Sequence, residues 1–580
     1  MKLGVTKASA SSSYNGLGDQ LYDLGGARPT LDLNFSSNES LVDSVTGKTL
    51  VDHTRQSSAT YVDGDGVIRT AVTNLFLQSE DFSTTWTKPI SVTITVNQTT
   101  APDGSLTADL IEGTGNNNFV NQPISLVSGT TYTISAYIKS AGLSKDTFRL
   151  FGDSIQFSDN FTATSSWQRF EFTFTATATG TRNGFVTRDS SDNPLGIYIW
   201  GAQLEQSSTV GQYVKTTTAI NSAPRFDHDP TTGESLGLLV EESRQNLLTY
   251  SACNSNWTTG GFGTATYDLG LSALGAFSGV SVGSLGQVWH TLYRSGINLT
   301  ASTVYAFTLF YRAGTSGRCR LVFRNNTTAT ETVINGAAGS LSVNGAFAGA
   351  ATVLSQYLCS DGLTYVVTGT FTPNGTSADH WFRIGPDSGT SGQTVIALGG
   401  QLEAGSYPTS YIPTSGSTAT RAADVSTSAA TFGNSWYEQD EGTVFAETIY
   451  NNDTSGATAF FNSASYNNLI SLQRDPSLDR WQADYFSGGS RQALLNLQTS
   501  TAPTGIAAKT ATSYKVDSFN ASANGGAIIS DASGLVPVGI TRVSLGFENV
   551  GGGAYVNGTI SRLTYWPTRL SNDTLQTITT

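Results

Sequence analysis

The sequence is poor in cysteine, methionine and charged residues. Of its 580 residues, 3 are cysteines, 1 is methionine and 13% are charged. Three cysteines cannot make a disulfide framework for a chain of this length, so buried apolar side chains have to hold the fold together. Cys319 and Cys359 fall within one predicted module, where a disulfide is one alternative, but we expect them, like Cys253, to be buried free thiols.

Long apolar runs are also missing. No window approaches the roughly 18 consecutive apolar residues of a membrane-spanning helix, which predicts no membrane insertion. The opening residues have no apolar segment of the kind found in a secretory signal. We therefore expect the protein to be made in a cytoplasm and to leave it by lysis or as part of a particle.

Positive charge is scarce as well. The chain has 31 Lys and Arg against 44 Asp and Glu, which gives a net charge of -13 and an isoelectric point near 4.8. Binding to a phosphate backbone depends on clustered Lys and Arg that displace counterions. The composition therefore argues against nucleic acid as a partner.

Turn and strand residues are abundant. The chain has 61 glycines and many Thr, Ser and Asn residues. β-branched and aromatic side chains pack on a pleated surface, while Gly and Asn adopt the positive φ of tight turns. Short segments with alternating apolar residues, such as Ser166–Ala178 and Leu363–Pro373, recur between such turns. This pattern predicts an all-β fold of tandem antiparallel β-sandwich modules of the jelly-roll type.

Two stretches of the chain repeat each other. Val67–Trp86 and Gly237–Trp257 share an Asn-Leu opening and a closing Trp, and a Gln-Leu-Glu triplet follows at 203–205 and again at 401–403. Such self-similarity predicts two copies of one module in tandem. We expect three tryptophans to anchor the cores of these copies: Trp86, Trp167 and Trp257.

The repeats and the changes in composition divide the chain into seven parts. The Ser/Thr-rich stretch before the last part has the composition of a linker. The predicted parts are an N-terminal attachment segment (1–30), a small β-rich cap (31–72), a first jelly roll (73–220), a joint (221–245), a second jelly roll (246–415), a linker (416–435) and a third sandwich (436–580).

The third sandwich resembles the laminin-G-like, concanavalin-type family. The resemblance lies in its closing pattern, Tyr514–Gly526, Ile540–Phe547 and Tyr555–Thr579. Within that pattern, Trp566–Leu570 is similar to the version found at the C-termini of phage structural and tail-fibre proteins. The resemblance implies a laminin-G-like sandwich at the end of the chain.

The two tandem copies resemble carbohydrate-binding-module-like jelly rolls. They share the Asn-Leu opening, a strand with Trp-Gln-Arg-Phe at 167–170 in the first copy, and the closing G-x-Q-L-E. The joint region Pro224–Ser251 also resembles a segment that recurs in phage tail and capsid-associated proteins. Together these resemblances imply a bacteriophage structural protein of the tail-fibre type.

Residues with catalytic potential are scattered. No nucleophile elbow, phosphate-binding loop or dinucleotide fingerprint is present. Glycan hydrolysis needs two acids a few ångströms apart, but the adjacent acids of this chain lie in turns and joints, so we expect no enzymatic activity. The four histidines are His53, His228, His290 and His380, and the acid pairs are Glu80/Asp81, Asp227/Asp229, Glu241/Glu242 and Asp475/Asp479.

The resemblance to jelly rolls also implies a structural calcium ion between the first and last strands. In the first copy, Glu80 or Asp81 with Glu205 would supply the oxygen ligands that a hard cation prefers. The second copy has Ser251 and Ala252 in place of the first two acids. Strand-end polar residues without a metal are the alternative, and we favour it.

Sugar binding requires an exposed aromatic side chain beside hydrogen-bonding groups. In the third sandwich the candidates are Tyr466, Asn467, Trp481 and Tyr485. The alternative, which we favour for Trp481 and Tyr485, is that their shared face is core.

These observations lead to one hypothesis and three rivals. We expect a non-enzymatic, homo-oligomeric and most simply trimeric virion appendage such as a tail fibre. Its N-terminal segment would attach to other virion proteins, and its distal modules would contact a host cell-surface glycan. The rivals are a capsid-bound decoration protein or head fibre, a secreted bacterial glycan-binding protein, and a glycan hydrolase.

Overall fold

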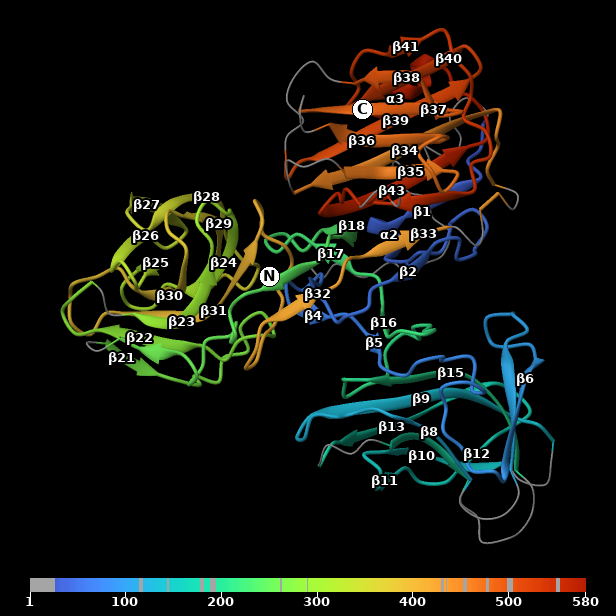
Figure 1. Ribbon diagram of the computed structural model, residues 1–580, viewed down its shortest axis with the longest axis horizontal. Coiled ribbons are helices and arrows are strands. Elements are labelled where there is room, and N and C mark those ends of the chain that lie inside the picture. The colour runs from blue at the N-terminus through green and yellow to red at the C-terminus, as the bar shows by residue number, and fades with distance from the viewer. Residues whose placement is uncertain are drawn as a thin grey trace, which may run out of the picture. The chain divides into compact units, whose positions relative to one another are not determined.

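The computed structural model describes residues 27–580 with short gaps, and the regular secondary structure of the described part is almost entirely β-strand (Figure 1). The gaps are at 114–117, 143–145, 178–181, 188–194, 261–262, 289–290, 429–431, 434–435, 452–455, 476–478, 498–503 and 549–552. The predicted attachment segment therefore lies largely outside the described residues. Within the described part, no helix has the length and hydropathy needed to cross a bilayer.

The chain forms two compact units. One is residues 54–59 with 70–224, and it contains the first sandwich. The other is residues 1–53, 60–69 and 225–580, and it contains the second and third sandwiches. The predicted all-β class with antiparallel sandwiches is confirmed, since all strand pairings in the three sandwiches are antiparallel.

The first sandwich has two five-stranded sheets. One has the order β13-β9-β15-β7-β6, and the other has the order β11-β10-β14-β8 with β12 also on β10. Along β9 the residues Tyr132, Ile134, Ala136 and Ile138 point into the core, as the period of two predicts. The strands are β6 (Val92–Thr99), β7 (Ala108–Gly113), β8 (Asn118–Pro123), β9 (Thr131–Ser140), β10 (Thr147–Gly152), β11 (Gln156–Phe157), β12 (Phe161–Thr162), β13 (Gln168–Thr175), β14 (Arg182–Thr187) and β15 (Leu195–Glu205), with β5 (Thr73–Asn74) paired to β16 (Asn221–Ser222).

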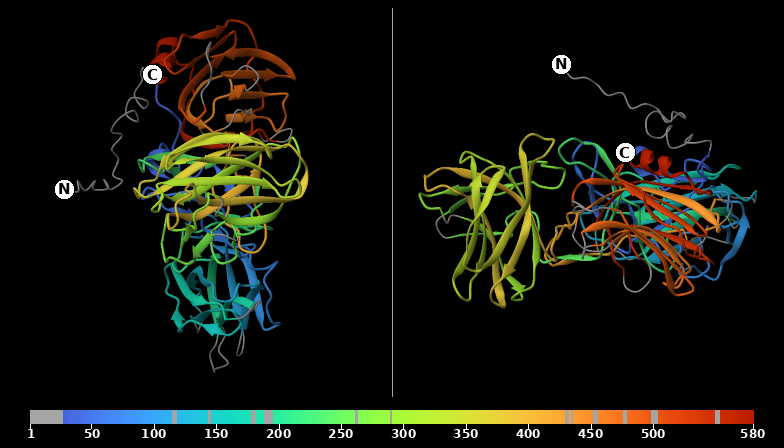
Figure 2. Two further views of the ribbon diagram at one scale, coloured as in Figure 1. Left: turned by 90° about the vertical axis from the view of Figure 1, so that its left-hand side faces the viewer. Right: turned by 90° about the horizontal axis from the view of Figure 1, so that it is seen from above.

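The second sandwich has two six-stranded sheets, seen as two layers in Figure 2. Their orders are β20-β23-β30-β25-β26-β27 and β21-β22-β31-β24-β29-β28. The strands are β20 (Thr258–Thr259), β21 (Gly263–Thr266), β22 (Val280–Ser284), β23 (Leu292–Leu299), β24 (Tyr305–Arg312), β25 (Arg318–Asn325), β26 (Thr330–Ala337), β27 (Ser340–Ala346), β28 (Gly349–Leu358), β29 (Thr364–Pro373), β30 (Ser377–Pro386) and β31 (Thr394–Ala404). Beside it, β19 (Arg244–Asn246) pairs with β32 (Ala419–Arg421).

The third sandwich is built from an eight-stranded and a seven-stranded sheet. The first has the order β17-β18-β43-β34-β39-β40-β41 with β1 also on β43, and the second has the order β2-β33-β42-β35-β36-β37-β38. The later strands are β34 (Glu441–Tyr450), β35 (Gly456–Asn462), β36 (Leu469–Asp475), β37 (Arg480–Ser487), β38 (Ser490–Asn496), β39 (Ala507–Lys515), β40 (Ser518–Ala523), β41 (Ile529–Asp531), β42 (Arg542–Leu545) and β43 (Gly558–Trp566). The short helix α3 (Asn572–Ile578) follows, capped by Ser571, where the sequence allowed one helical turn.

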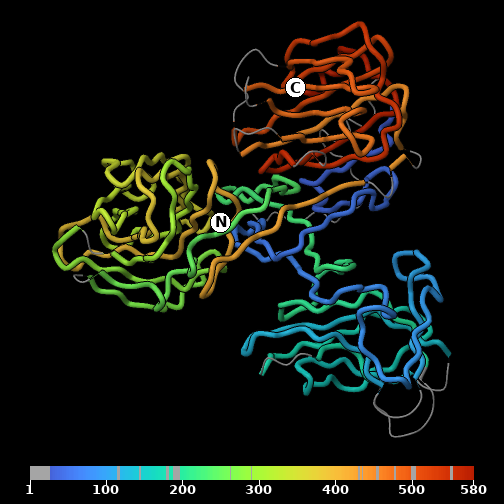
Figure 3. The backbone as a smooth tube through the Cα atoms, in the orientation of Figure 1, coloured from blue at the N-terminus to red at the C-terminus, as the bar shows by residue number. Residues whose placement is uncertain are grey.

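Strands from far upstream complete this third sandwich. They come from segments expected to form a cap, a joint and a linker: β1 (Leu31–Asn34), β2 (Asp52–Thr54), β17 (Phe226–His228), β18 (Ser235–Val240) and β33 (Val425–Thr427). In Figure 3 the blue tube of the first segment runs beside the orange and red strands. Their side chains join the same core, so these segments differ from the independent parts that composition predicts. The remaining upstream elements are helix α2 (Phe35–Asn38) and the pair β3 (Thr60–Val62) and β4 (Ile68–Thr70).

A buried ion pair fixes β1 to β43. Both carboxylate oxygens of Asp32 accept from Arg562, at 2.8 and 2.9 Å, and Oδ1 also accepts from the Thr564 hydroxyl at 2.8 Å. Both side chains are buried, so removal of either partner would leave an uncompensated charge in the core. The stability of the third sandwich therefore depends on both residues.

The asparagine that opens each repeat has the same role in both copies. Asn74 accepts hydrogen bonds from the amides of Phe76 and Leu204, while Asn246 accepts from those of Leu248 and Leu402. In each copy the asparagine thus ties the opening segment to the last strand. Its amide group donates to the chain beyond that strand, to Val214 O in the first copy at 2.8 Å and to Ile412 O in the second at 2.8 Å.

The repeated Gln-Leu-Glu triplet is structural too. In the first copy Gln203 donates to Glu205 at 2.8 Å, and in the second Gln401 donates to Glu403 at 3.0 Å. Both glutamines also accept from a backbone amide of the following segment. The repeated triplet therefore holds the segment after the last strand against each sandwich, and this role is structural.

The three cysteines, Cys253, Cys319 and Cys359, are buried free thiols as expected. Burial raises the pKa of all three thiols above the ordinary value. The predicted tryptophan anchors are confirmed for Trp86 and Trp257, which are buried. Trp167 is the exception, since it is only half-buried and its ring lies against Lys139 Nζ at 5.2 Å.

Candidate binding groove

The aromatic residues that the sequence proposes for sugar binding are not brought together. Trp481 is 2% exposed and Tyr485 is fully buried, and both belong to the core of the third sandwich. The two are therefore excluded as a sugar platform. Tyr466 is 42% exposed and donates to Glu548 at 2.8 Å, and Asn467 is exposed beside it in the same turn.

The acids proposed as calcium ligands have other partners. Glu80 accepts from Tyr213 at 3.1 Å and pairs with Lys215 at 2.7 Å, while Asp81 accepts from Ser83. Glu205 is buried and accepts from Gln203 and the Gly211 amide. Across the residues that the structure describes, no three His, Cys, Asp or Glu side chains are grouped to hold a metal ion. The residues present do not fit a calcium site.

The remaining acid pairs serve the architecture. Asp229 accepts from the turn residue Thr231, and Asp479 pairs with Arg474. Glu242 accepts from Tyr407 at 2.6 Å. Each of these three acids thus has its own partner, and their contacts do not create the facing carboxylates of a hydrolase.

Glu241 belongs to a buried ionic cluster of the joint. Arg225 contacts Glu241 at 2.9 Å and Asp424 at 2.5 Å, and Arg421 contacts Glu241 at 3.1 Å. Burial by itself would raise the pKa of Glu241, but Arg421 and Arg225 outweigh it and lower the pKa. Asp227, buried nearby, has its pKa raised by burial to about 6. The histidine His53 lies 3.7 Å from Asp424 at the edge of the cluster.

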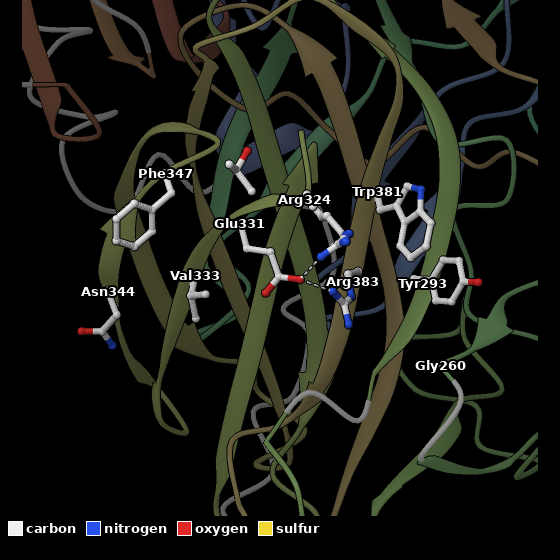
Figure 4. A pocket seen from close by; sticks show the side chains of 11 residues that line it. Gly260, Tyr293, Arg324, Glu331, Val333, Asn344, Phe347, Trp381 and Arg383 are labelled. Atoms are coloured by element: carbon white, nitrogen blue, oxygen red, sulfur yellow. Dashed lines mark hydrogen bonds and ion pairs between the residues drawn. The ribbon is translucent and has the colours of Figure 1, made fainter. Parts of the chain in front are cut away.

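An open groove on the second sandwich brings together aromatic and charged side chains. It occupies about 810 Å³ over the outer face of the sheet that contains β25, β26 and β30. The volume is within the usual range for small-molecule sites. Figure 4 shows its lining: Gly260, Tyr293, Arg324, Ala329, Thr330, Glu331, Val333, Asn344, Phe347, Trp381 and Arg383.

The strand register explains why these residues meet. Tyr293, Arg383, Val322, Val333 and Asn344 follow one another directly across five strands. Neighbours along each of these strands point into the core, because side chains alternate between the faces of a sheet. A row of outward residues is therefore fixed by pairing between segments that are distant in the sequence.

Aromatic rings form the two sides of the groove. On one side Tyr293 stacks on Trp381, with ring centroids 4.4 Å apart and planes 4° apart. Trp381 is held by its indole nitrogen, which donates to Asp379 at 2.7 Å. On the other side Phe347 is 72% exposed, which leaves its ring open to a ligand (Figure 4).

Charged groups lie between the aromatic sides. One oxygen of Glu331 accepts from Arg324 Nη1 at 2.8 Å and from Arg383 Nη1 at 2.5 Å (Figure 4). Burial lowers the pKa of the Arg383 guanidinium, an effect that Glu331 opposes and the other arginines reinforce. Arginine still remains charged at any physiological pH. The groove thus offers fixed N–H donors beside apolar rings.

The sequence contained a signal for this groove. In β25 the arginines at 318, 320 and 324 fall on the outward positions between buried Cys319, Leu321 and Phe323. Alternation predicts that they share a face, but only the strand order places Trp381 and Glu331 on the same face. The groove could not be predicted from the sequence, because the strand order results from pairing between segments that are distant in the sequence.

A comparison with known proteins agrees with the sandwich fold. A family model described as a carbohydrate binding domain, CBM_4_9, matches residues 78–187. The match lies within the first sandwich, which is thus similar to this family. No curated protein matches the chain.

Solved structures similar to parts of the chain have low sequence identity and low TM-scores. The CBM40 module of the Ruminococcus gnavus IT-sialidase bound to α2,6-sialyllactose has 16% identity and a TM-score of 0.22, covering 25% of this chain and 85% of its own. The CBM22-1–CBM22-2 tandem of Paenibacillus barcinonensis Xyn10C has 10% identity and a TM-score of 0.17, covering 60% and 98%. Domains LG4-5 of the mouse laminin α1 chain have 11% identity and a TM-score of 0.18, covering 56% and 88%.

Proposed function

We propose that the protein binds glycans and that the groove of the second sandwich is a binding site. The observation that carries the proposal is the placement of Phe347 opposite the Tyr293–Trp381 stack, with guanidinium donors between them. Sugar rings pack their C–H faces against aromatic rings, and their hydroxyl groups need directed hydrogen bonds. The groove supplies both.

The family match supports this proposal from a different part of the chain. The carbohydrate binding domain model covers the first sandwich, and the second sandwich repeats its framework through Asn246 and the Gln401–Glu403 triplet. The second sandwich, which the family model does not match, thus shares these framework contacts with the sandwich that it does match. The copy with the open groove is the better candidate for contact with a sugar.

We further propose that the groove binds without cleaving. Hydrolysis of a glycosidic bond uses two carboxyl groups, one on each side of the bond. Glu331 is the one carboxylate among the described lining residues, and two arginines hold it through a single oxygen. A second carboxyl group facing Glu331 is therefore missing from the described lining.

As a finer assignment, we propose that the chain is a homo-oligomeric appendage of a bacteriophage particle that contacts a host glycan. The support is the sequence resemblance of Pro224–Ser251 and of Trp566–Leu570 to phage structural proteins. None of the matches given above is a phage protein. Mass spectrometry of purified particles should detect the chain, and a purified monomer that is absent from particles would favour a secreted glycan-binding protein.

Glycan binding is tested with the full chain on a glycan array, followed by titration calorimetry with the best ligand. We expect Phe347→Ala and Trp381→Ala each to weaken binding about twofold to tenfold, because each removes an aromatic contact worth about 0.5–1.5 kcal/mol. Tyr466→Ala is the matched control, since it removes an exposed ring of the third sandwich. Loss of binding with Tyr466→Ala alone would move the site to the third sandwich and overturn the proposal for the groove.

A further inference from the structure

We infer that the groove selects acidic glycans and that Arg320, Arg324 and Arg383 receive a carboxylate or sulfate group of the sugar. This inference rests on the proposed glycan binding and names its ligand class. It starts from the positions of the three guanidinium groups on the sheet.

Arg324 and Arg383 line the groove, and Arg320 lies beside the lining on the same outer face. Arg383 lies directly opposite Val322, and Arg320 and Arg324 lie two residues to either side of Val322 on the same strand. Residues two apart on a strand share a face, and diagonal neighbours across a strand pair are within reach of long side chains. The three positive charges are therefore adjacent.

The protein supplies too few acids to balance them. Glu331 is shared between Arg324 and Arg383 through one oxygen. The next acid along the face, Asp387, is occupied by Arg318 at 2.6 Å and by the Asn335 amide at 2.6 Å. A third acid of this face, Asp379, accepts from Trp381 and from Asn326. On this face four arginines thus meet three carboxylates, although the whole chain has a net charge of -13.

Arg320 makes no hydrogen bond or ion pair in the part of the chain that the structure describes, and its Nε is buried. Burial lowers the pKa of this guanidinium, an effect that the charges of Glu331 and Asp387 oppose, and the group still remains charged. A buried N–H donor without a hydrogen bond is unfavourable, and more so when it is charged. A bound anion would accept that hydrogen bond.

The geometry of the donors favours a carboxylate or sulfate group. Guanidinium groups bind planar or tetrahedral oxyanions through two parallel hydrogen bonds, which is stronger than binding to a neutral hydroxyl. Apolar rings flank the charged patch on both sides, so an isolated small anion would leave Phe347 uncovered. An oxyanion attached to a sugar ring satisfies the arginines and the rings together.

The test compares acidic glycans with their uncharged counterparts on one array probed with the full chain. The pairs are oligogalacturonate and its methyl ester, sialylated and desialylated lactose, and a sulfated galactan oligosaccharide and its desulfated form. We expect at least one acidic member to bind about tenfold or more tightly than its counterpart. The pair that responds distinguishes carboxylate from sulfate.

Two further measurements assign the effect to Arg320. Arg320→Gln should lower the affinity for the acidic ligand about tenfold and leave the affinity for its uncharged counterpart unchanged. Thermal unfolding of the variant checks that the fold is intact. The matched control is Arg149→Gln, which removes a guanidinium from the outer face of β10 in the first sandwich. For the unaltered chain, raising the salt concentration from about 0.05 M to about 0.5 M should lower the affinity for the acidic ligand and leave that for the uncharged ligand unchanged.

The outcomes separate this inference from the proposed function. Equal binding of acidic and uncharged members overturns the inference and leaves glycan binding intact, as does unchanged binding of the acidic ligand by Arg320→Gln. An array on which no glycan binds overturns the proposed function itself.

Discussion

In the first sandwich Asn74 accepts from the amide of Leu204, and in the second Asn246 accepts from the amide of Leu402. The two copies also share the buried Gln-Glu contact and a buried tryptophan near the opening of the domain. Their outer faces are different. On the face that corresponds to the groove, the first copy carries packed phenylalanines. The ring centroid of Phe151 lies 5.4 Å from that of Phe119 and 5.6 Å from that of Phe157.

The difference has its origin in one segment. Between β10 and β13 the first sandwich has only the two-residue strands β11 and β12, at 153–167. The corresponding segment of the second sandwich, 326–363, forms β26, β27 and β28 and supplies Glu331, Val333 and Phe347 to the groove. Residues that hold the framework are therefore kept between the copies, while the groove combines outward residues of the common strands, such as Trp381 and Arg383, with residues of an inserted segment. Similarity between copies is evidence for a shared fold and not for a shared ligand.

The largest effects should come from the shared tryptophans. We expect Trp86→Ala and Trp257→Ala each to lower the free energy of unfolding by about 3–5 kcal/mol, because both rings are buried and leave a cavity. Differential scanning calorimetry of the full chain should show a lowered transition in each case. A large effect in one copy and none in the other would contradict the equivalence of the two tryptophans.

Intermediate effects should come from the shared asparagines. Asn74→Ala and Asn246→Ala leave buried backbone groups without partners, so we expect each to cost about 1–3 kcal/mol in the free energy of unfolding. Chemical denaturation monitored by fluorescence measures the change. Thr173→Ala, whose hydroxyl bonds only to another threonine at a partly exposed position, serves as a control with little expected effect.

The smallest effect should be the contribution of the shared glutamates to the pH dependence of stability. Burial raises the pKa of Glu205 and of Glu403 in the folded chain, so the folded state holds these protons more tightly than the unfolded state. Their contribution to stability is present below the unfolded value of about 4.5 and is lost as the pH rises through the raised pKa. Glu205→Gln and Glu403→Gln should each flatten the fall in melting temperature between about pH 4 and about pH 7. A steeper fall in either variant would contradict the assignment.

Local patterns in the sequence predicted much of the fold. Alternation within Ser166–Ala178 and Leu363–Pro373 identified the strands β13 and β29. These features depend on neighbours within about ten residues. The predicted module boundaries depend on pairings such as β1 with β43, which composition does not reveal.

The binding site was less predictable for a related reason. Alternation places Trp481 and Tyr485 on one face of β37, but it does not say whether that face is core, and the structure shows that it is. The groove depends on β23, β30, β25, β26 and β27 lying side by side in that order. Without the order, Arg320 and Trp381 are unrelated residues in two strands.

The pairing of β1 with β43 has a consequence for how the chain matures. Leu31 lies beside Tyr565, so the ribosome adds more than 500 residues before the partner of the first strand exists. At about 5–20 residues per second this delay is roughly half a minute to two minutes. The two tandem sandwiches have their strands close together in the sequence and are free to fold during the delay. The third sandwich closes last, and the nascent strand 31–34 needs protection from aggregation until then.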